Sequence, residues 1–281
     1  MTRSSTMNPA LLAEAHALLA QTGLVDAHAD FAWRHLERGS HVLSGEGCEA
    51  ISLDRWQRAH VKLQGAALYT PPALTGPAAT AYAQRMVDYV HACCAERPDA
   101  LTLVRSASDL ARCTAAESRT VGLLLWIEGV SPFAGSLELA ESFAAQGVRG
   151  VGLTHNAANE AGDGCFVQDP KGLTSFGHEL VVWLQSQRMI VDLAHLSKPG
   201  FWDVLRHTHT PVVVSHTGLE FKVATPRNLD DQQLHALADC GGVVGIDFYP
   251  GHVGRVSPRG SMRATVRDVA DCLDHVCALV G

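Results

Sequence analysis

Side chains that can bind a divalent metal ion stand at the ends of several apolar stretches in this sequence. The first such stretch begins at Leu24 and ends with a histidine and an aspartate, His28 and Asp30. Side chains alternate along a β-strand, so residues two apart point to the same side. A neutral imidazole and a carboxylate at one strand end suit zinc. By itself this pair is a weak signal, because the spacing often arises by chance.

Later apolar runs end in the same way. Four of them lead directly into a glutamate or a histidine, and these residues are Glu128, His155, His195 and His216. Each one alone has an ordinary explanation, such as a hydrogen-bonded core histidine or a glutamate that caps the next helix. Together with the first pair they form a set of strand-end ligands that chance does not readily produce. The sequence has 15 histidines, and the remaining ones lie in predicted helices or loops.

Strand and helix patterns alternate along the chain. The apolar segments predicted as strands are 24–30, 65–70, 121–129, 148–155, 189–195, 211–216 and 243–249. Stretches with apolar residues at helical spacing separate most of them, as in α/β folds with a parallel sheet. We expect an α/β fold, a (β/α)8 TIM-like barrel that lacks its eighth strand because the chain ends early. A doubly wound sheet is the alternative, and in both folds functional residues lie at the carboxyl ends of the strands.

The expected domain organisation is simple. Residues 1–23 form an N-terminal helical segment, and residues 24–281 form a metal-dependent barrel domain that is incomplete at its C-terminus. Residues 31–35 are expected to continue the first strand as a loop. The Gly-, Asn- and Asp-containing stretch 156–172 is predicted as a longer loop. The last helix is predicted over residues 262–279.

Composition narrows the classes of function. Of the 281 residues, 47% are hydrophobic and 18% are charged, and the formal net charge is −7. Without a dense run of Lys or Arg, these values fit a globular enzyme and argue against nucleic acid as a partner. No apolar run reaches the roughly 18 residues of a membrane span, and Met1 to Gln21 resembles an amphipathic helix more than a signal peptide. The eight cysteines show no metal-site spacing, so we expect reduced thiols and a cytoplasmic location.

The candidate ligands are sufficient for two metal ions. With Glu128 bridging through both carboxylate oxygens, one ion would take His28 and Asp30, and the other would take His195 and His216. Two ions about 3.5–4 Å apart can share a water molecule, lower its pKa toward ~7 and polarise a carbonyl or phosphoryl oxygen. The pattern therefore predicts metal-assisted hydrolysis. Two Zn²⁺ ions are expected, although Mn²⁺ or Fe²⁺ would also accept these ligands.

At this point the chain resembles the membrane (renal) dipeptidase family, binuclear zinc peptidases within the amidohydrolase superfamily. The resemblance extends from Leu24 to about Tyr249 and rests on several motifs in the same order. These motifs are Asp26-Ala-His-Ala-Asp30 followed by Trp33, Ile127-Glu128-Gly129, Leu153-Thr-His-Asn156, Val191-Asp-Leu-Ala-His195-Leu-Ser197, Val214-Ser-His216, Arg227-Asn228 and Gly241-Gly-Val-Val.

The resemblance implies a role for each candidate residue. The implied metal ligands are His28, Asp30, Glu128, His195 and His216, with Glu128 as the bridging and catalytic carboxylate. His155 would be catalytic, polarising the scissile carbonyl and stabilising the oxyanion. Arg227 would bind the substrate carboxylate, and Tyr249 would line the pocket. A hydroxide that bridges two zinc ions would then hydrolyse dipeptides, including those with a D-residue at the second position.

The resemblance also exposes a difference. The family's eighth strand carries a Gly/Asp-rich motif whose aspartate moves a proton to the leaving amine, and this sequence stops at Gly281 before such a motif. We expect either a truncated product of a longer gene or a strand supplied by another chain.

Three functions stay open on the sequence alone. The first is a zinc dipeptidase, and the second is another amidohydrolase that acts on an N-acyl amino acid, a lactone or a phosphoester. The third is an inactive, metal-binding relic. The expected partner is a dipeptide or a similar small substrate with a free carboxylate, and assembly as a homodimer is left open.

Overall fold

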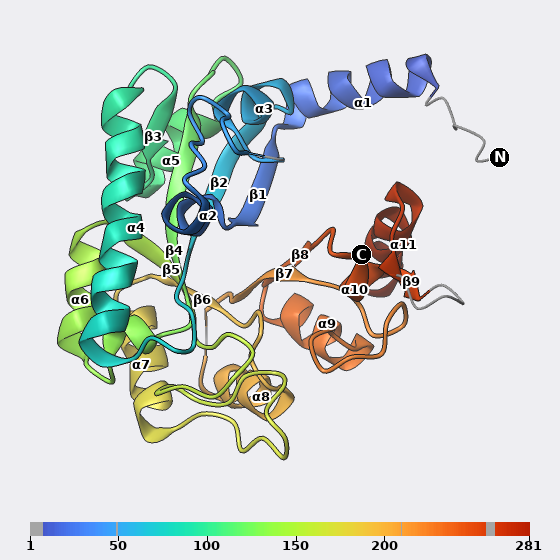
Figure 1. Cartoon of the computed structure of the whole chain (residues 1–281). Coiled ribbons are helices and arrows are strands. Elements are labelled where there is room, and N and C mark those ends of the chain that lie inside the picture. The colour runs from blue at the N-terminus through green and yellow to red at the C-terminus, as the bar shows by residue number, and fades with distance from the viewer. Residues whose placement is uncertain (1–7, 49, 209, 257–261) are drawn as a thin grey trace. The chain divides into compact units, whose positions relative to one another are not determined.

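The computed structural model describes residues 8–48, 50–208, 210–256 and 262–281 (Figure 1). The chain divides into two compact units, each described by itself. The first unit comprises Met1–Ala67 and Arg85–Leu125, and the second comprises Leu68–Gln84 and Trp126–Gly281. His28 and Asp30 therefore belong to the first unit, whereas the later candidate ligands belong to the second.

Parallel strands form the main sheet, in the order β1-β2-β4-β5-β6-β7-β8 with β3 beside β4. Each pairing with a described register is parallel: β1 with β2, β3 with β4, and β5 through β8 in succession. The strands are β1 (Leu24–Ala29), β2 (Val61–Tyr69), β3 (Leu101–Leu103), β4 (Val121–Glu128), β5 (Val148–Gly152), β6 (Ile190–Asp192), β7 (Val213–Thr217) and β8 (Val243–Ile246). All the strands predicted from the sequence are present. Of the strands in this sheet, β3 was missed, because three residues carry too little pattern.

Four helices belong to the first unit, and a fifth, α4, crosses its boundary. They are α1 (Pro9–Thr22), α2 (Phe31–Arg38), α3 (Leu53–Arg58), α4 (Gly76–Glu96) and α5 (Ala107–Thr114). The Asn8 side chain accepts a hydrogen bond from the Ala10 amide and caps α1, within the segment predicted to be helical. No residue of α1 is buried, and Figure 1 shows the helix leading into β1.

The prediction of a loop over residues 31–35 is wrong, because these residues form the beginning of α2. Phe31 and Ala32 are buried, and the Phe31 ring packs edge-on against Trp56 with 5.3 Å between ring centroids. The helix ends at Gly39, whose φ of 65° lies in the left-handed region that glycine adopts without strain. Burial of these apolar side chains stabilises a short helix that local sequence alone does not indicate.

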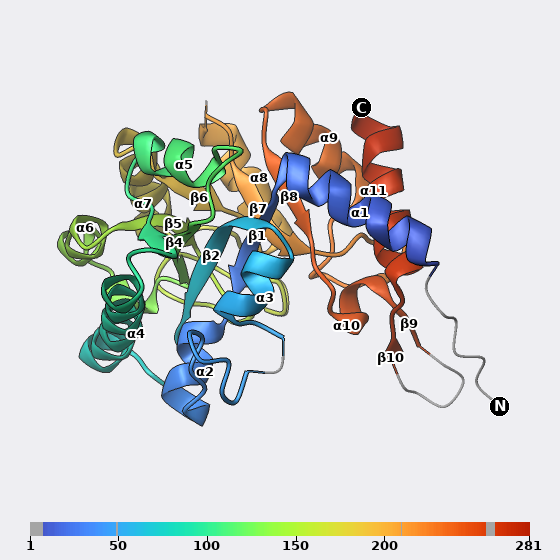
Figure 2. The same ribbon diagram turned by 90° about the horizontal axis from the view of Figure 1, so that it is seen from above.

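Helices of the second unit begin at residues that cap them. The Ser136, Thr174, Ser197, Asp230 and Thr265 side chains each accept a backbone N–H in the first turn. These helices are α6 (Leu137–Ala145), α7 (Ser175–Ser186), α8 (Lys198–His207), α9 (Asp231–Asp239) and α11 (Val266–Val280), with the shorter η1 (Ser131–Phe133) and α10 (Pro250–Val253) between them. Figure 2 shows α9 and α11 beside β8, and they also contact one another. In the described part of the chain, no helix is both long and apolar enough to cross a membrane.

The last helix starts later than the predicted residue 262. Thr265 and Asp268 form a capping box, in which each side chain accepts the other residue's backbone N–H. The preceding residues belong to β10 (Met262–Arg263), which pairs with β9 (Arg255–Val256) in an antiparallel ribbon. The cap therefore sets the start of α11 at Val266.

Trp126 links the core of the second unit to the carboxyl end of β6. This residue of β4 is 3% exposed, and its indole Nε1 donates to Asp192 at the end of β6 over 2.9 Å. Gly150 of β5 leaves room for the indole, because a Cβ at Gly150 would lie 2.4 Å from the Trp126 ring. A buried, hydrogen-bonded indole cannot move aside easily.

Replacing Gly150 with Ala is therefore expected to destabilise the protein by about 1–3 kcal/mol through overpacking. The measurement is the free energy of unfolding in denaturant. Gly152→Ala in the same strand is the matched control, because its added Cβ would meet other atoms no closer than 3.4 Å. Equal stability of the two variants would contradict this account of Gly150.

Candidate metal centre

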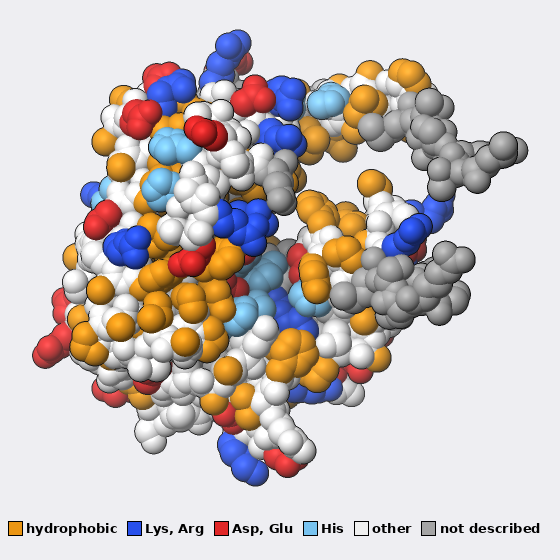
Figure 3. Space-filling view, in the orientation of Figure 1, with side chains coloured by type: hydrophobic (Ala, Val, Ile, Leu, Met, Phe, Trp, Pro, Cys, Tyr) orange, Lys and Arg blue, Asp and Glu red, His pale blue; other side chains and the backbone are white. Residues whose placement is uncertain are grey.

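The second unit brings four of the predicted residues together. Glu128 ends β4, His216 lies on β7, and His155 and His195 follow β5 and β6. One ligand atom from each of Glu128, His155 and His195 lies within 4.8 Å of the other two. Histidine side chains are visible on the face drawn in Figure 3. The carboxyl ends of parallel strands thus supply the cluster, as predicted.

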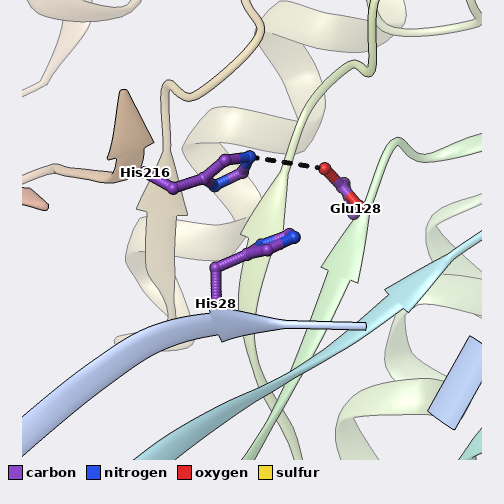
Figure 4. Close-up of side chains that lie close together, drawn as sticks. All are labelled: His28, Glu128 and His216. Atoms are coloured by element: carbon purple, nitrogen blue, oxygen red, sulfur yellow. Dashed lines mark ion pairs between the residues drawn. The ribbon is translucent and has the colours of Figure 1, made fainter. Parts of the chain in front are cut away.

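Two imidazoles and one carboxylate converge at short range. The Nε2 atoms of His195 and His216 are 2.8 Å apart. Glu128 Oε1 lies 3.2 Å from the first and 3.6 Å from the second. Figure 4 shows the Glu128 carboxylate facing the His216 ring. Glu128 is 6% exposed and His195 is 8% exposed, so water screens this charge poorly.

Hydrogen bonds on the far side of each ring determine which nitrogen faces the cluster. His195 Nδ1 lies 2.8 Å from Asn156 Oδ1, and His216 Nδ1 lies 2.9 Å from Ser215 Oγ. The Asn156 oxygen only accepts, so it takes the Nδ1 proton of His195. The Ser215 hydroxyl uses its proton on Asp192 and accepts from His216. Each Nε2 then presents a lone pair to the cluster. Two lone pairs 2.8 Å apart beside a carboxylate are suited to bind a cation between them.

Asp192 fixes the Ser215 hydroxyl that orients His216. The carboxylate is 2% exposed and accepts the Ser215 hydroxyl over 2.5 Å and the Trp126 indole over 2.9 Å. It also accepts the backbone N–H groups of Ala194 and Ser215, each over 2.9 Å. A carboxylate with four donors is rigid, and it connects the core to His216 through one hydroxyl.

The backbone at His195 adopts an unusual conformation. Its φ is 63°, in the left-handed region that a residue with a side chain seldom occupies. Two donors hold its carbonyl, the Cys165 amide at 2.7 Å and the Thr154 hydroxyl at 3.2 Å. Such strain, about 1–3 kcal/mol, persists where surrounding contacts impose it, as at functional sites.

Cys165 supports the same imidazole indirectly. Its thiol donates to Asn156 Oδ1 over 3.5 Å, so that this oxygen accepts from both Cys165 and His195. Burial raises the pKa of the Cys165 thiol, and the nearby Arg227 guanidinium only partly opposes this effect. The group therefore stays protonated and remains a donor.

His155 occupies the side of the cluster next to β2. Its ring centroid lies 4.7 Å from that of Tyr69 and 4.4 Å from that of His195. His155 and Glu128 both line a cavity of about 330 Å³. A small molecule in this cavity would therefore lie against both side chains.

Arg227 contacts the backbone of β7. The guanidinium is 3% exposed, and its Nη2 donates to the His216 carbonyl over 2.6 Å. Its Nε has no hydrogen-bond partner among the described residues. Burial lowers the pKa of Arg227, while Cys165 and the Asp247, Glu128 and Asp192 carboxylates oppose the shift. An arginine stays charged even so, which leaves a buried cation beside a metal-ligand strand.

Three further predicted residues are Tyr249, His28 and Asp30. Tyr249 follows β8 in the second unit, is 54% exposed, and packs its ring against His252 at 4.8 Å between centroids. In the first unit, His28 Nε2 lies 3.7 Å from Asp30 Oδ1. The His28 amide donates to Asp26 Oδ1 over 3.1 Å, and burial raises the pKa of Asp26. The spacing of two residues thus places His28 and Asp30 close together, as expected from the sequence.

Sequence reasoning assigned no role to the residues that orient the imidazoles. Asn156, Asp192 and Ser215 each occur in the motifs quoted above, but only as neighbours of a histidine or at the end of an apolar run. Their positions do carry a signal: a polar side chain adjacent to a ligand, or one that ends a buried strand, is suitably placed to hold that ligand.

Loss of the Ser215 hydroxyl is expected to weaken metal binding. Ser215→Ala removes the acceptor for His216 Nδ1, so zinc affinity should fall about 10- to 100-fold. Competition with a chromophoric chelator measures the affinity, and the melting temperature checks folding. Ser186→Ala is the control, because that exposed serine donates only to the Trp183 carbonyl. Unchanged affinity in folded Ser215→Ala would refute the positioning role.

The comparisons with known proteins bear on this centre. Residues 12–281 match the family described as membrane dipeptidase, peptidase family M19. A curated Klebsiella pneumoniae protein, named only as an uncharacterized protein in the pqqA 5' region, is 37% identical over 53% of this chain and 56% of its own length. Dipeptidase aclJ of Aspergillus oryzae is 30% identical over 70% of this chain and 46% of its own length. The chain thus spans about half the length of the curated relatives that it matches.

The fold has a close counterpart among solved structures. The structure of a metallopeptidase described as dipeptidase AC of family M19 superposes with a TM-score of 0.83 and 25% identity, covering 93% of this chain and 82% of that one. This match confirms the α/β fold of TIM-barrel type predicted from the sequence. On the family match over residues 12–281, the chain belongs to the membrane dipeptidase family, peptidase family M19.

Proposed function

We propose that the chain is a metal-dependent dipeptidase that hydrolyses the peptide bond of dipeptides, including those with a D-residue at the second position. The observation that carries the proposal is the convergence of Glu128 Oε1 with two imidazole Nε2 atoms 2.8 Å apart, each ring anchored through Nδ1. Membership of the dipeptidase family gives the substrate class. The donor set suits zinc, and manganese or iron would also accept it.

The residues that would hold two zinc ions are His28, Asp30, Glu128, His195 and His216. Glu128 would bridge the ions, and the first-unit pair would complete the ligand set. When bound, the ions supply Lewis-acid polarisation of the scissile carbonyl and a water molecule of lowered pKa as the nucleophile. The geometry of Glu128, His195 and His216 supports this assignment, because these side chains leave their lone pairs facing one another.

The other side chains would bind and orient the dipeptide. His155, which lines the cavity with Glu128, would donate to the scissile carbonyl oxygen and stabilise the negative charge that develops there. Arg227 would take the substrate carboxylate through donors such as its Nε–H, which is otherwise without a partner among the described residues. Tyr249 would line the outer part of the pocket.

The central test is hydrolysis of a panel of L,L- and L,D-dipeptides by the zinc-reconstituted chain. Turnover is expected for the wild type and should fall at least about 100-fold in Glu128→Gln, which loses the charge that offsets the metal ions. Glu128→Gln should also lose tight binding of both ions in a metal titration. Two ions retained with wild-type affinity would sink the bridging assignment, and wild-type hydrolysis of esters alone would point to another amidohydrolase.

Arg227 provides a second test. Arg227→Lys keeps the charge but loses the planar fork, so KM for a dipeptide should rise about 10-fold or more. The KM for a neutral ester that lacks a free carboxylate should change much less. Because Arg227 is buried, the melting temperature of the variant is measured alongside. An equal rise of KM for both substrates would show that Arg227 acts on the structure of the site and not on the carboxylate.

A further inference from the structure

The cavity that Glu128 and His155 line has a second carboxylate. Glu160 lines it together with these two residues. No hydrogen bond or ion pair of the Glu160 carboxylate occurs among the described residues, and its Oε2 is buried without a partner. Neither lysine nor arginine is among the residues that line the cavity. The negative charge of Glu160 thus has no internal counterion, which is costly so close to a buried site.

The loop holds Glu160 in place on both sides. The Asn159 side chain donates to the Leu153 carbonyl over 2.8 Å and accepts the Ala161 amide over 2.9 Å. The Glu160 carbonyl itself accepts the Thr174 hydroxyl over 2.6 Å. The backbone at Glu160 is therefore held by hydrogen bonds.

Most of the other residues that line the cavity are small or apolar. Pro72, Ala157 and Ala158 line it, and its volume of about 330 Å³ can accommodate an amino-acid side chain. An apolar wall that leads to an uncompensated carboxylate matches a methylene stem that ends in a cation. Lysine, ornithine and arginine side chains have this form.

The direction of the substrate follows from the proposed function, on which this inference rests. Arg227 is bonded to the β7 residue His216, whereas the cavity lies where β2, β4 and β5 end. A dipeptide with its carboxylate at Arg227 and its scissile carbonyl at His155 directs its N-terminal residue toward Glu160. We propose that Glu160 is a specificity residue that selects dipeptides with a basic side chain on the N-terminal residue.

The test compares Lys-Ala with norleucyl-Ala, which has the same stem without the charge. The wild type should favour Lys-Ala about 10- to 100-fold in kcat/KM, the range of one charge-assisted hydrogen bond. In Glu160→Gln this ratio should fall close to one. Glu160→Lys should instead favour Glu-Ala over Lys-Ala. Glu179→Gln, a change at an exposed residue of α7, is the matched control and should keep the wild-type ratio.

Two readouts separate this inference from the proposed function. Hydrolysis of Ala-Ala measures dipeptidase activity independently of Glu160, because alanine has no side-chain cation. If no dipeptide is cleaved, calorimetric binding of Lys-Ala and norleucyl-Ala to the zinc-loaded chain still measures the preference. A wild-type ratio near one, or a ratio that Glu160→Gln leaves unchanged, would overturn the proposal. An equal loss with both substrates in Glu160→Gln would also overturn it, since only a side-chain cation distinguishes the two.

Discussion

The structure depends on an unfavourable contact. Two imidazole nitrogens, each left with a lone pair by its own hydrogen bond, lie 2.8 Å apart next to the Glu128 carboxylate. A positive charge among such donors stabilises the group, so this arrangement is suited to a cation. The surrounding contacts keep the donors from relaxing apart: Asn156 and Ser215 fix the rings, and two donors hold the strained carbonyl of His195.

The same network joins the metal centre to the folding of the second unit. Asp192 accepts four hydrogen bonds, one from an indole deep in the sheet and one from the hydroxyl that orients His216. The indole fits only beside a glycine on the next strand. Core packing at Trp126 therefore also affects Asp192, and through Ser215 the orientation of the His216 ring. A rigid support of this kind lowers the reorganisation needed when a metal or substrate binds.

Charge is distributed unevenly around this centre. A buried guanidinium stands on the β7 side, and an unpaired carboxylate stands in the loop after β5. Their signs match those of a substrate with a carboxylate at one end and a cation toward the other. On the function and the inference proposed above, the loop would supply specificity and the strand ends the chemistry, as expected of folds with this topology.

Much of this protein could be predicted from the sequence by itself. Apolar runs that end in Glu128, His155, His195 or His216 predict both the strands and the convergence of these side chains, because parallel strands present their carboxyl ends at one edge. The short helix after Asp30 and the start of α11 could not be placed, because burial of Phe31 and a reciprocal cap at Thr265 decide them. Only the tertiary structure showed which polar neighbours orient the rings and that Arg227 is buried against His216. It also showed that Glu160 has no counterion within the part of the chain that is described. These properties depend on distances between residues far apart in the chain, which no local pattern records.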